Sequence, residues 1–215
     1  HGLNVSLTSS DMLILPELIA VDIADVQQDS AMFLTTPTPG AANVTGVLGY
    51  VADTKLSVDR GFFTDPFDVV ITTATEDAQI YYTPNGSKPT PETGILYTNP
   101  ITVSNTIVLR AAAFKPGYQP SNVDTQTYIF LEDVIEQDGA GFPDSWGHAG
   151  ADYEMDPDVV SAYSDTIIED LKSVPSVSLV MNMDDMFGAG GVGIYPSGEG
   201  SPRATSFELI DPGDL

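Results

Sequence analysis

Between Lys55 and Phe130, short runs rich in Val, Ile, Thr and Tyr alternate with clusters of Gly, Pro, Asn and Asp. The runs are "KLSVDRGFF", "FDVVITTAT", "AQIYYT", "GILYT", "ITVS", "TIVLRAAAF" and "TQTYIF". β-Branched and aromatic residues favour strands, and the intervening clusters favour tight turns. Short strands spaced by turns in this way predict an antiparallel β-sandwich.

Two of these runs show which side of the strand should face the core. Alternate residues of a strand point to opposite faces of the sheet. The residues that alternation assigns to the core are Phe67, Val69, Ile71, Ile107, Leu109, Ala111 and Ala113. Arg110 falls on the other face of its run, so we expect it to be a solvated strand residue.

The segments on either side of the sandwich differ from it in texture. Residues 1–45 combine an apolar stretch with the Pro/Gly-rich "TTPTPGAAN" and are predicted to form an extended N-terminal segment or linker. The sandwich domain is then assigned to residues 46–131, and residues 132–215 to a small mixed α/β segment.

Within the C-terminal segment, "EDVIEQDGAGFPDSWGHAGADYEMDPD" is rich in Gly and Asp and is predicted to be irregular. A short helix is predicted at "TIIEDLKS", where Thr166 and Glu169 have capping-box spacing. "VPSVSLVM" is interpreted as a buried strand, "DDMFG" as a helical turn ending at Gly188, and "ATSFELI" as a final strand.

Charge excludes two classes of partner. The chain has 31 Asp and Glu against 7 Lys and Arg, a formal net charge of -24 that repels phosphate backbones and anionic headgroups. Nucleic acid is therefore not an expected partner.

The apolar run "MLILPELIAV" is interrupted by Pro16 and Glu17 and is too short to span a bilayer, so no transmembrane segment is predicted.

Several motifs in the sandwich resemble those of a known family. They are "IYYTPNGSKPT" (Ile80–Thr90), "YTNPI" (Tyr97–Ile101) and "LRAAAFKPGYQPS" (Leu109–Ser121). This pattern is similar to the chitobiase/β-hexosaminidase C-terminal type of module, an accessory domain of secreted bacterial proteins. The resemblance implies an immunoglobulin-like fold and an extracytoplasmic, bacterial protein. Asn85 replaces the Asp usual in the family, and both residues suit the turn before Gly86.

The flanks resemble a second family. "FLTTPTPGAAN", "LSVDRGFF", "VDTQTYIFLEDVI", "MDPDVV" and "VPSVSLVMNMDDMFGAGGVGIY" are similar to the region that precedes and begins a CotH-type kinase domain in large envelope or secreted bacterial proteins. The catalytic residues of that family lie downstream of the strand matched by "ATSFELI". No kinase residue is therefore carried over to this chain, and the resemblance implies no catalysis by it.

Acidic pairs offer candidate ligands for a hard metal ion. Carboxylate oxygens suit Ca²⁺, so Asp156, Asp158, Asp184 and Asp185 are hypothetical Ca²⁺ ligands, although none matches an EF-hand loop. The alternative interpretation is that Asp158 and Asp184 cap helices. Apart from this Ca²⁺ hypothesis, no cofactor is expected.

Aromatic residues offer a candidate ligand site. Tyr82, Tyr97, Tyr118 and Trp146 form a hypothetical stacking platform for sugar rings. Tyr81 and Tyr82 should lie on opposite faces of one strand, so at least one of the two is expected in the core.

A remote alternative rests on the two histidines, His1 and His148. An N-terminal histidine with a second histidine is the copper brace of lytic polysaccharide monooxygenases. An arbitrary first residue explains His1 equally well, because the chain is interpreted as either a processed protein or a fragment of a larger one.

Together these features predict a non-catalytic extracytoplasmic scaffold module that docks on a larger envelope or secreted assembly, with other protein subunits or domains as partners. The apolar residues of the segments outside the sandwich support docking, since they need a surface to cover them. The alternative is an accessory carbohydrate-binding module of a secreted enzyme, and the remote alternative is the copper enzyme.

Overall fold

The computed structural model describes residues 33–34, 46–142, 144–145, 150–188, 193–194 and 202–211, with only the backbone of Phe33 and Leu34. Those two residues form β1 (Phe33–Leu34), which pairs antiparallel with β2 (Gly46–Val47). The rest of the predicted N-terminal extended segment lies outside the described residues.

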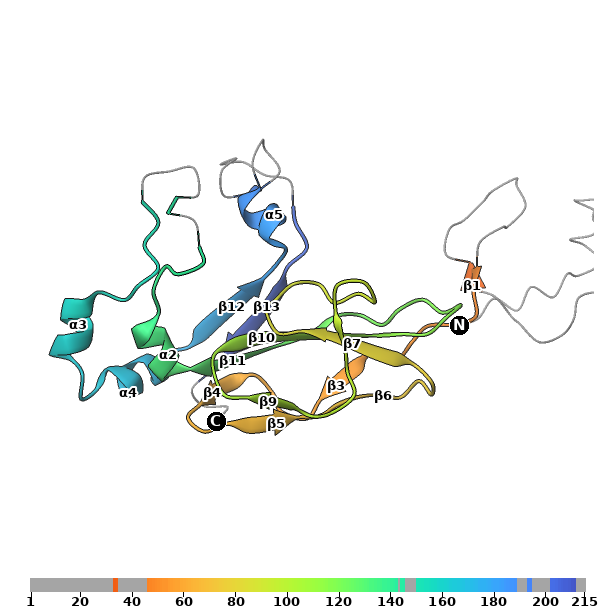
Figure 1. Cartoon of the computed structure of the whole chain (residues 1–215), viewed down its shortest axis with the longest axis horizontal. Helices are drawn as coiled ribbons and strands as arrows, with labels where there is room; N and C mark the ends of the chain where they lie inside the picture. The colour runs from red at the N-terminus through yellow and green to blue at the C-terminus, as the bar shows by residue number, and fades with distance from the viewer. Residues whose placement is uncertain are drawn as a thin grey trace, which may run out of the picture.

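The predicted β-sandwich is confirmed (Figure 1). One layer is a five-stranded sheet in the order β4-β11-β10-β7-β8, and the other consists of the antiparallel pairs β3-β6 and β5-β9. Neighbouring strands are antiparallel except β4 and β11, which are parallel. The strands are β3 (Thr54–Leu56), β4 (Gly61–Phe63), β5 (Phe67–Val69), β6 (Ile71–Thr73), β7 (Gln79–Thr83), β8 (Ile95–Leu96), β9 (Ile101–Val103), β10 (Ile107–Phe114) and β11 (Asp124–Phe130).

Two predicted strands are each divided in two. "FDVVITTAT" contributes β5 to one pair and β6 to the other, with exposed Val70 between them. Val70 and Ser57 bond to each other, as the Ser57 amide donates to the Val70 carbonyl and the Val70 amide to Ser57 Oγ, at 2.9 and 2.8 Å. "KLSVDRGFF" is divided in the same way into β3 and β4. Local propensity predicts an extended chain here, but long-range pairing decides which sheet each half joins.

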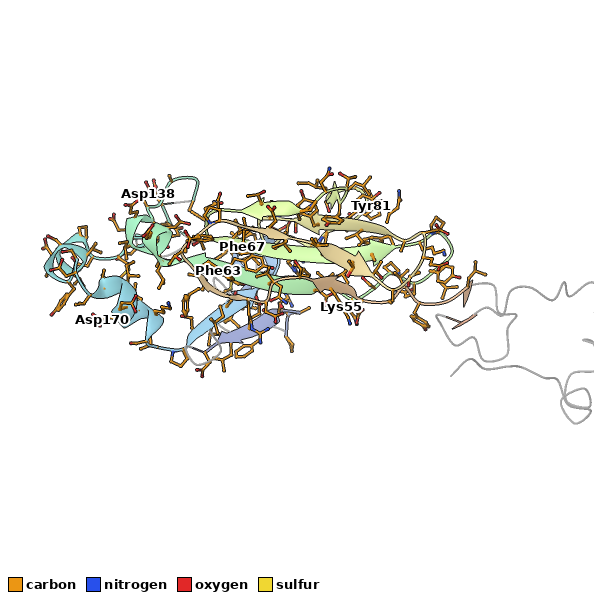
Figure 2. All side chains as sticks on the ribbon, turned by 90° about the horizontal axis from the view of Figure 1, so that it is seen from below. Lys55, Phe63, Phe67, Tyr81, Asp138 and Asp170 are labelled. Carbon is orange, nitrogen blue, oxygen red and sulfur yellow. The ribbon has the colours of Figure 1, made fainter. Side chains whose placement is uncertain are left out.

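The core lies between the two layers. It contains the predicted alternate residues of both runs, with Val69, Leu109, Ala111 and Ala113 at 0–1% exposure. Phe63 and Phe67, which lie side by side in Figure 2, have ring centroids 4.2 Å apart, and both meet the buried Tyr128 ring edge-on. Phe130 stacks on the Phe67 ring. Edge-to-face and stacked aromatic pairs of this kind stabilise the core beyond the area that they bury.

The C-terminal segment is mixed α/β, as predicted. Its elements are α2 (Leu131–Glu136), α3 (Pro157–Ala162), α4 (Ile167–Lys172), β12 (Ser176–Val180), α5 (Met183–Phe187) and β13 (Ser206–Ile210). The prediction of an irregular stretch after Phe130 was wrong at α2, where Leu131 packs with Phe62 and Ile210 in a second apolar cluster. A tertiary contact therefore stabilises a helix that the local sequence pattern does not predict.

Helix capping differs from the prediction in detail. Thr166 precedes α4 as predicted, but its side chain makes no capping hydrogen bond, so the predicted capping box is not formed. α5 ends at Gly188 as predicted. No helix of the described residues is long and apolar enough to cross a membrane.

Candidate functional site

The outer face of the five-stranded sheet, turned away from the core, is where the C-terminal segment attaches. Leu109, Ala111 and Ala113 of β10 point into the sandwich, so the intervening β10 residues point outward. Near Val108 this face is covered by the antiparallel strand pair β12 and β13, called the β12-β13 hairpin below although α5 lies between its strands in the sequence (Figure 1). Near Phe114 the face borders an open groove. The two halves of one face thus have different surroundings.

Arg110 lies between these halves and is not the solvated residue that the sequence predicted. Its Nε donates to Thr125 Oγ1 at 3.3 Å, and its Nη1 donates to the Gly86 carbonyl at 3.1 Å. Burial lowers the pKa of its guanidinium. Arg110 therefore links the turn after β7 to β11 and has a structural role on this face of the sheet.

A buried carboxylate holds the β12-β13 hairpin on the sheet. Glu208 of β13 and Thr127 of β11 are 4% and 6% exposed. Thr127 donates twice to Glu208, from its hydroxyl to Oε2 at 2.6 Å and from its backbone N–H to Oε1 at 3.3 Å. Hydrogen bonds to an ionised carboxylate are about twice as strong as neutral ones, so this pair fixes the hairpin's position.

Further contacts support the attachment. The hydroxyl groups of Ser178 and Thr127 lie 2.8 Å apart, within hydrogen-bond distance. Arg60 Nε donates to the Leu209 carbonyl at 2.9 Å. The hairpin is thus held from both of its strands and from the loop before β4.

The hairpin turns its apolar side chains outward. In the antiparallel register, Val177 faces Leu209 and Leu179 faces Phe207. These side chains are 54%, 45%, 55% and 64% exposed, respectively. We call Val177, Leu179, Phe207 and Leu209 the apolar face. The prediction of a buried strand at "VPSVSLVM" was therefore right about the strand and wrong about burial.

The reversal has a simple cause. Strand period places Ser176, Ser178 and Val180 on the side that meets the sandwich, opposite Val177 and Leu179. Thr127 needs polar partners there, and Ser178 and Glu208 provide them. The inner side of the hairpin therefore carries these polar groups together with the buried side chains of Val180 and Ile210.

The predicted aromatic platform is distributed over different places. Tyr82 and Tyr97 form an edge-to-face pair with centroids 6.5 Å apart, and both pack against the core. Tyr118 also packs against the core, next to Gly49, with Lys115 Nζ 5.2 Å from its ring centroid. Trp146 lies outside the described residues, as do His1 and His148. Sugar binding by these side chains stays a prediction.

The predicted calcium ligands fall into two separate pairs. Asp156, not Asp158, is the N-cap of α3, and it accepts from the Asp158 amide at 2.9 Å. Asp158 and Asp184 lie in the first turns of α3 and α5, so the prediction that these two residues are the caps was wrong. Asp185 forms an ion pair with Arg203 at 3.1 Å.

Among the described residues, no three or more His, Asp or Glu side chains are grouped so as to hold a metal ion. Calcium binding stays a prediction.

A groove that the sequence analysis missed lies at the open half of the outer face. It encloses about 450 Å³ and is bordered by the turn after β7, the segment before β11 and Tyr50. Tyr50 pairs with Gln119 in an isolated parallel bridge, and its side chain is 61% exposed. This pairing joins residues far apart in the sequence, so no local pattern could have indicated the groove.

One carboxyl group and one phenol group of the sandwich, those of Asp124 and Tyr128, have raised pKa values. Burial raises the pKa of Asp124, although a hydrogen bond from Thr54 opposes the shift. Burial, followed by the charges of Asp59 and Glu208, raises the pKa of Tyr128. The Tyr128 hydroxyl donates to the Val58 carbonyl at 2.8 Å, so Tyr128 has a structural role in the core.

Comparison with known families identifies the sandwich. Residues 58–125 match the family model of the chitobiase/beta-hexosaminidase C-terminal domain, and this confirms the resemblance predicted for that stretch. The match does not extend to the flanks, so their similarity to the CotH-type region stays a prediction. Searches of curated proteins and of solved structures gave no match.

Proposed function

We propose that this chain is a non-catalytic accessory module of an extracytoplasmic protein, and that it docks on another protein domain through the apolar face of the β12-β13 hairpin. The observation that carries the proposal is the orientation of that hairpin. Its inner side is occupied by the hydrogen bonds of Glu208 and Ser178, and its outer side presents Leu179 and Phe207 at 55% and 64% exposure.

Burial of the apolar face would be favourable. Each large apolar side chain gains about 1.5–3 kcal/mol when it is fully buried, and the four side chains are already more than a third buried by their neighbours. Cross-strand pairing makes them one continuous surface. Val174 and Met183, which flank β12 in the sequence, are also exposed, each at 52%. A centre of this composition, surrounded by a polar rim, is typical of protein interfaces.

A different protein is a better candidate partner than a second copy of this chain. Two copies would each bring a net charge of -24 to the interface, and the repulsion between them opposes association at low ionic strength. We therefore expect a partner with an apolar patch and a neutral or basic surround.

The accessory role and the location rest on the family match. The matched family is named as the C-terminal domain of chitobiase and β-hexosaminidase, and a terminal domain associated with such enzymes supports an accessory role for this chain. The same association supports an extracytoplasmic location. The CotH-type resemblance of the flanks supports the same location.

Site-specific photo-crosslinking tests the docking proposal. A benzophenone amino acid is placed at Phe207 and, as a matched control, at Tyr163, an aromatic residue of similar exposure (58%) next to α3. In cells that make the natural protein, we expect a defined protein adduct from position 207 and none from position 163. Equal adducts from both positions, or no protein adduct from position 207, would refute the proposal.

A further inference from the structure

The groove beside Tyr50 is lined by aromatic and small side chains. Ala112, which lies on the outer face of β10 and is buried, lines the groove together with Tyr50 and Phe114. The Phe114 ring is held edge-to-face against Tyr81, at 5.7 Å between centroids. Tyr81 lies toward the end of the sandwich remote from Asp170 of α4, as Figure 2 shows.

The backbone around Tyr50 is fixed. Val51 N–H donates to the Gln119 carbonyl and Gln119 N–H to the Gly49 carbonyl, each at 2.9 Å. Val51 is 4% exposed and belongs to the core, so alternation directs Tyr50 outward. A rigid backbone presenting an aromatic ring reduces the entropy lost when a ligand binds.

Neutral polar groups surround the aromatic rings. The groove is bordered by the amides of Gln119 and Asn122 and by the hydroxyl groups of Thr90 and Ser121. Asn122 is held in place because its N–H and its side-chain amide both donate to Asp53, at 2.9 and 3.3 Å. Within the described part of the chain, no donor bonds to its side-chain oxygen, which can therefore accept from a ligand.

The charge of the groove is unusual for this chain. The protein has 31 Asp and Glu, yet no carboxylate is among the residues that line the groove, and Lys88 is the charged side chain there. A cationic ligand finds no ion pair in such a lining. A neutral, hydroxyl-rich ligand with an apolar ring face finds stacking on aromatic side chains and hydrogen bonds from amides.

We infer that this groove is a binding site for a neutral oligosaccharide, with one sugar ring stacked on Tyr50 and its hydroxyl groups bonded by Gln119 and Asn122. The volume of about 450 Å³ lies within the range of small-ligand sites, about 300–1,000 Å³. This site is distinct from the apolar face, and it differs from the predicted platform of Tyr82, Tyr97 and Tyr118. It goes beyond the docking function, which does not depend on it.

Glycan-array screening followed by titration calorimetry tests the inference, with neutral chito-, cello- and xylo-oligosaccharides of six units among the probes. We expect the intact chain to bind at least one neutral oligosaccharide. Tyr50→Ala should weaken binding by about tenfold or more, as truncation of an aromatic anchor does. Tyr50→Phe keeps the ring and should retain most of the affinity.

Two controls make the result specific. Tyr163→Ala removes an equally exposed tyrosine far from the groove and should bind like the unmodified protein. The double variant Leu179→Ser/Phe207→Ser removes most of the apolar face and should also keep sugar binding, so failure of docking and failure of the groove are distinguishable. Thermal unfolding confirms that each variant is folded.

Three outcomes would overturn the inference. The first is the absence of binding to any neutral oligosaccharide, and the second is binding that is unchanged in Tyr50→Ala. The third is binding of a proline-rich peptide, added to the same screen, at this groove in place of sugars, because such peptides also dock on aromatic grooves.

Discussion

Thr127→Val tests whether a buried hydrogen bond holds the β12-β13 hairpin on the sandwich. The substitution keeps a β-branched side chain of similar size and removes the hydroxyl that donates to Glu208 Oε2 at 2.6 Å and lies 2.8 Å from Ser178 Oγ. The Thr127 N–H bond to Glu208 Oε1 remains. Both residues are at least nine-tenths buried, so water cannot easily replace the lost donor.

The expected cost follows from these contacts. A hydrogen bond to a charged group contributes about 1.5–3 kcal/mol, so we expect the free energy of unfolding to fall by about 2 kcal/mol. Ser178→Ala is the matched control, because it removes only the Thr127–Ser178 bond and should cost about 1 kcal/mol. Glu208→Gln can keep both contacts with Thr127 and should be milder than Thr127→Val.

Urea unfolding followed by far-UV circular dichroism gives the stability, and amide hydrogen exchange locates the change. We expect a lower unfolding midpoint and faster exchange in β12 and β13, with β7 and β10 protected as before. The reasoning fails if Thr127→Val stays within about 0.5 kcal/mol of the parent protein, or if exchange in the hairpin is unchanged.

Three further predictions concern the sandwich. Leu109→Ala, at a position with 0% exposure, should lower the free energy of unfolding in urea by about 2–5 kcal/mol. The control Leu96→Ala, at 43% exposure, should cost under about 1 kcal/mol, and equal costs would contradict the assigned core. Gly86→Ala should cost more than about 1–2 kcal/mol of stability, because φ is 74° and the new Cβ would lie 3.2 Å from Val180 Cγ1. The control Gly141→Ala, with φ 86° and no atom within 4 Å, should show the cost of the backbone conformation alone. A larger loss of stability in Gly141→Ala would refute the contact with Val180. Burial raises the pKa of Asp124, so the folded state holds this proton more tightly than the unfolded state, and stability should fall as pH rises from about 3.9 through the raised value. Asp124→Asn should lack that fall in melting temperature measured across the acidic range, and an unchanged pH profile would contradict the assignment.

Local sequence patterns were sufficient to predict the class of the sandwich and the core positions of several of its strands, although not the division of two runs between the layers. Alternation over two residues is imposed by the strand itself, so the core positions of β5, β6 and β10 could be predicted without knowledge of their partners. The Asn85–Gly86 turn follows equally from local chemistry, since Gly86 adopts a positive φ of 74° and Asn85 Oδ1 accepts from Ser87.

The functional surfaces depended on contacts between distant parts of the chain. Glu208 meets Thr127 across 81 positions in the sequence, and this contact decides which side of the hairpin is inner and leaves Leu179 and Phe207 outside. The groove exists because Tyr50 pairs with Gln119. Periodicity says that a strand has two different faces, but only the packing of one layer on another determines which face meets the protein and which meets a partner.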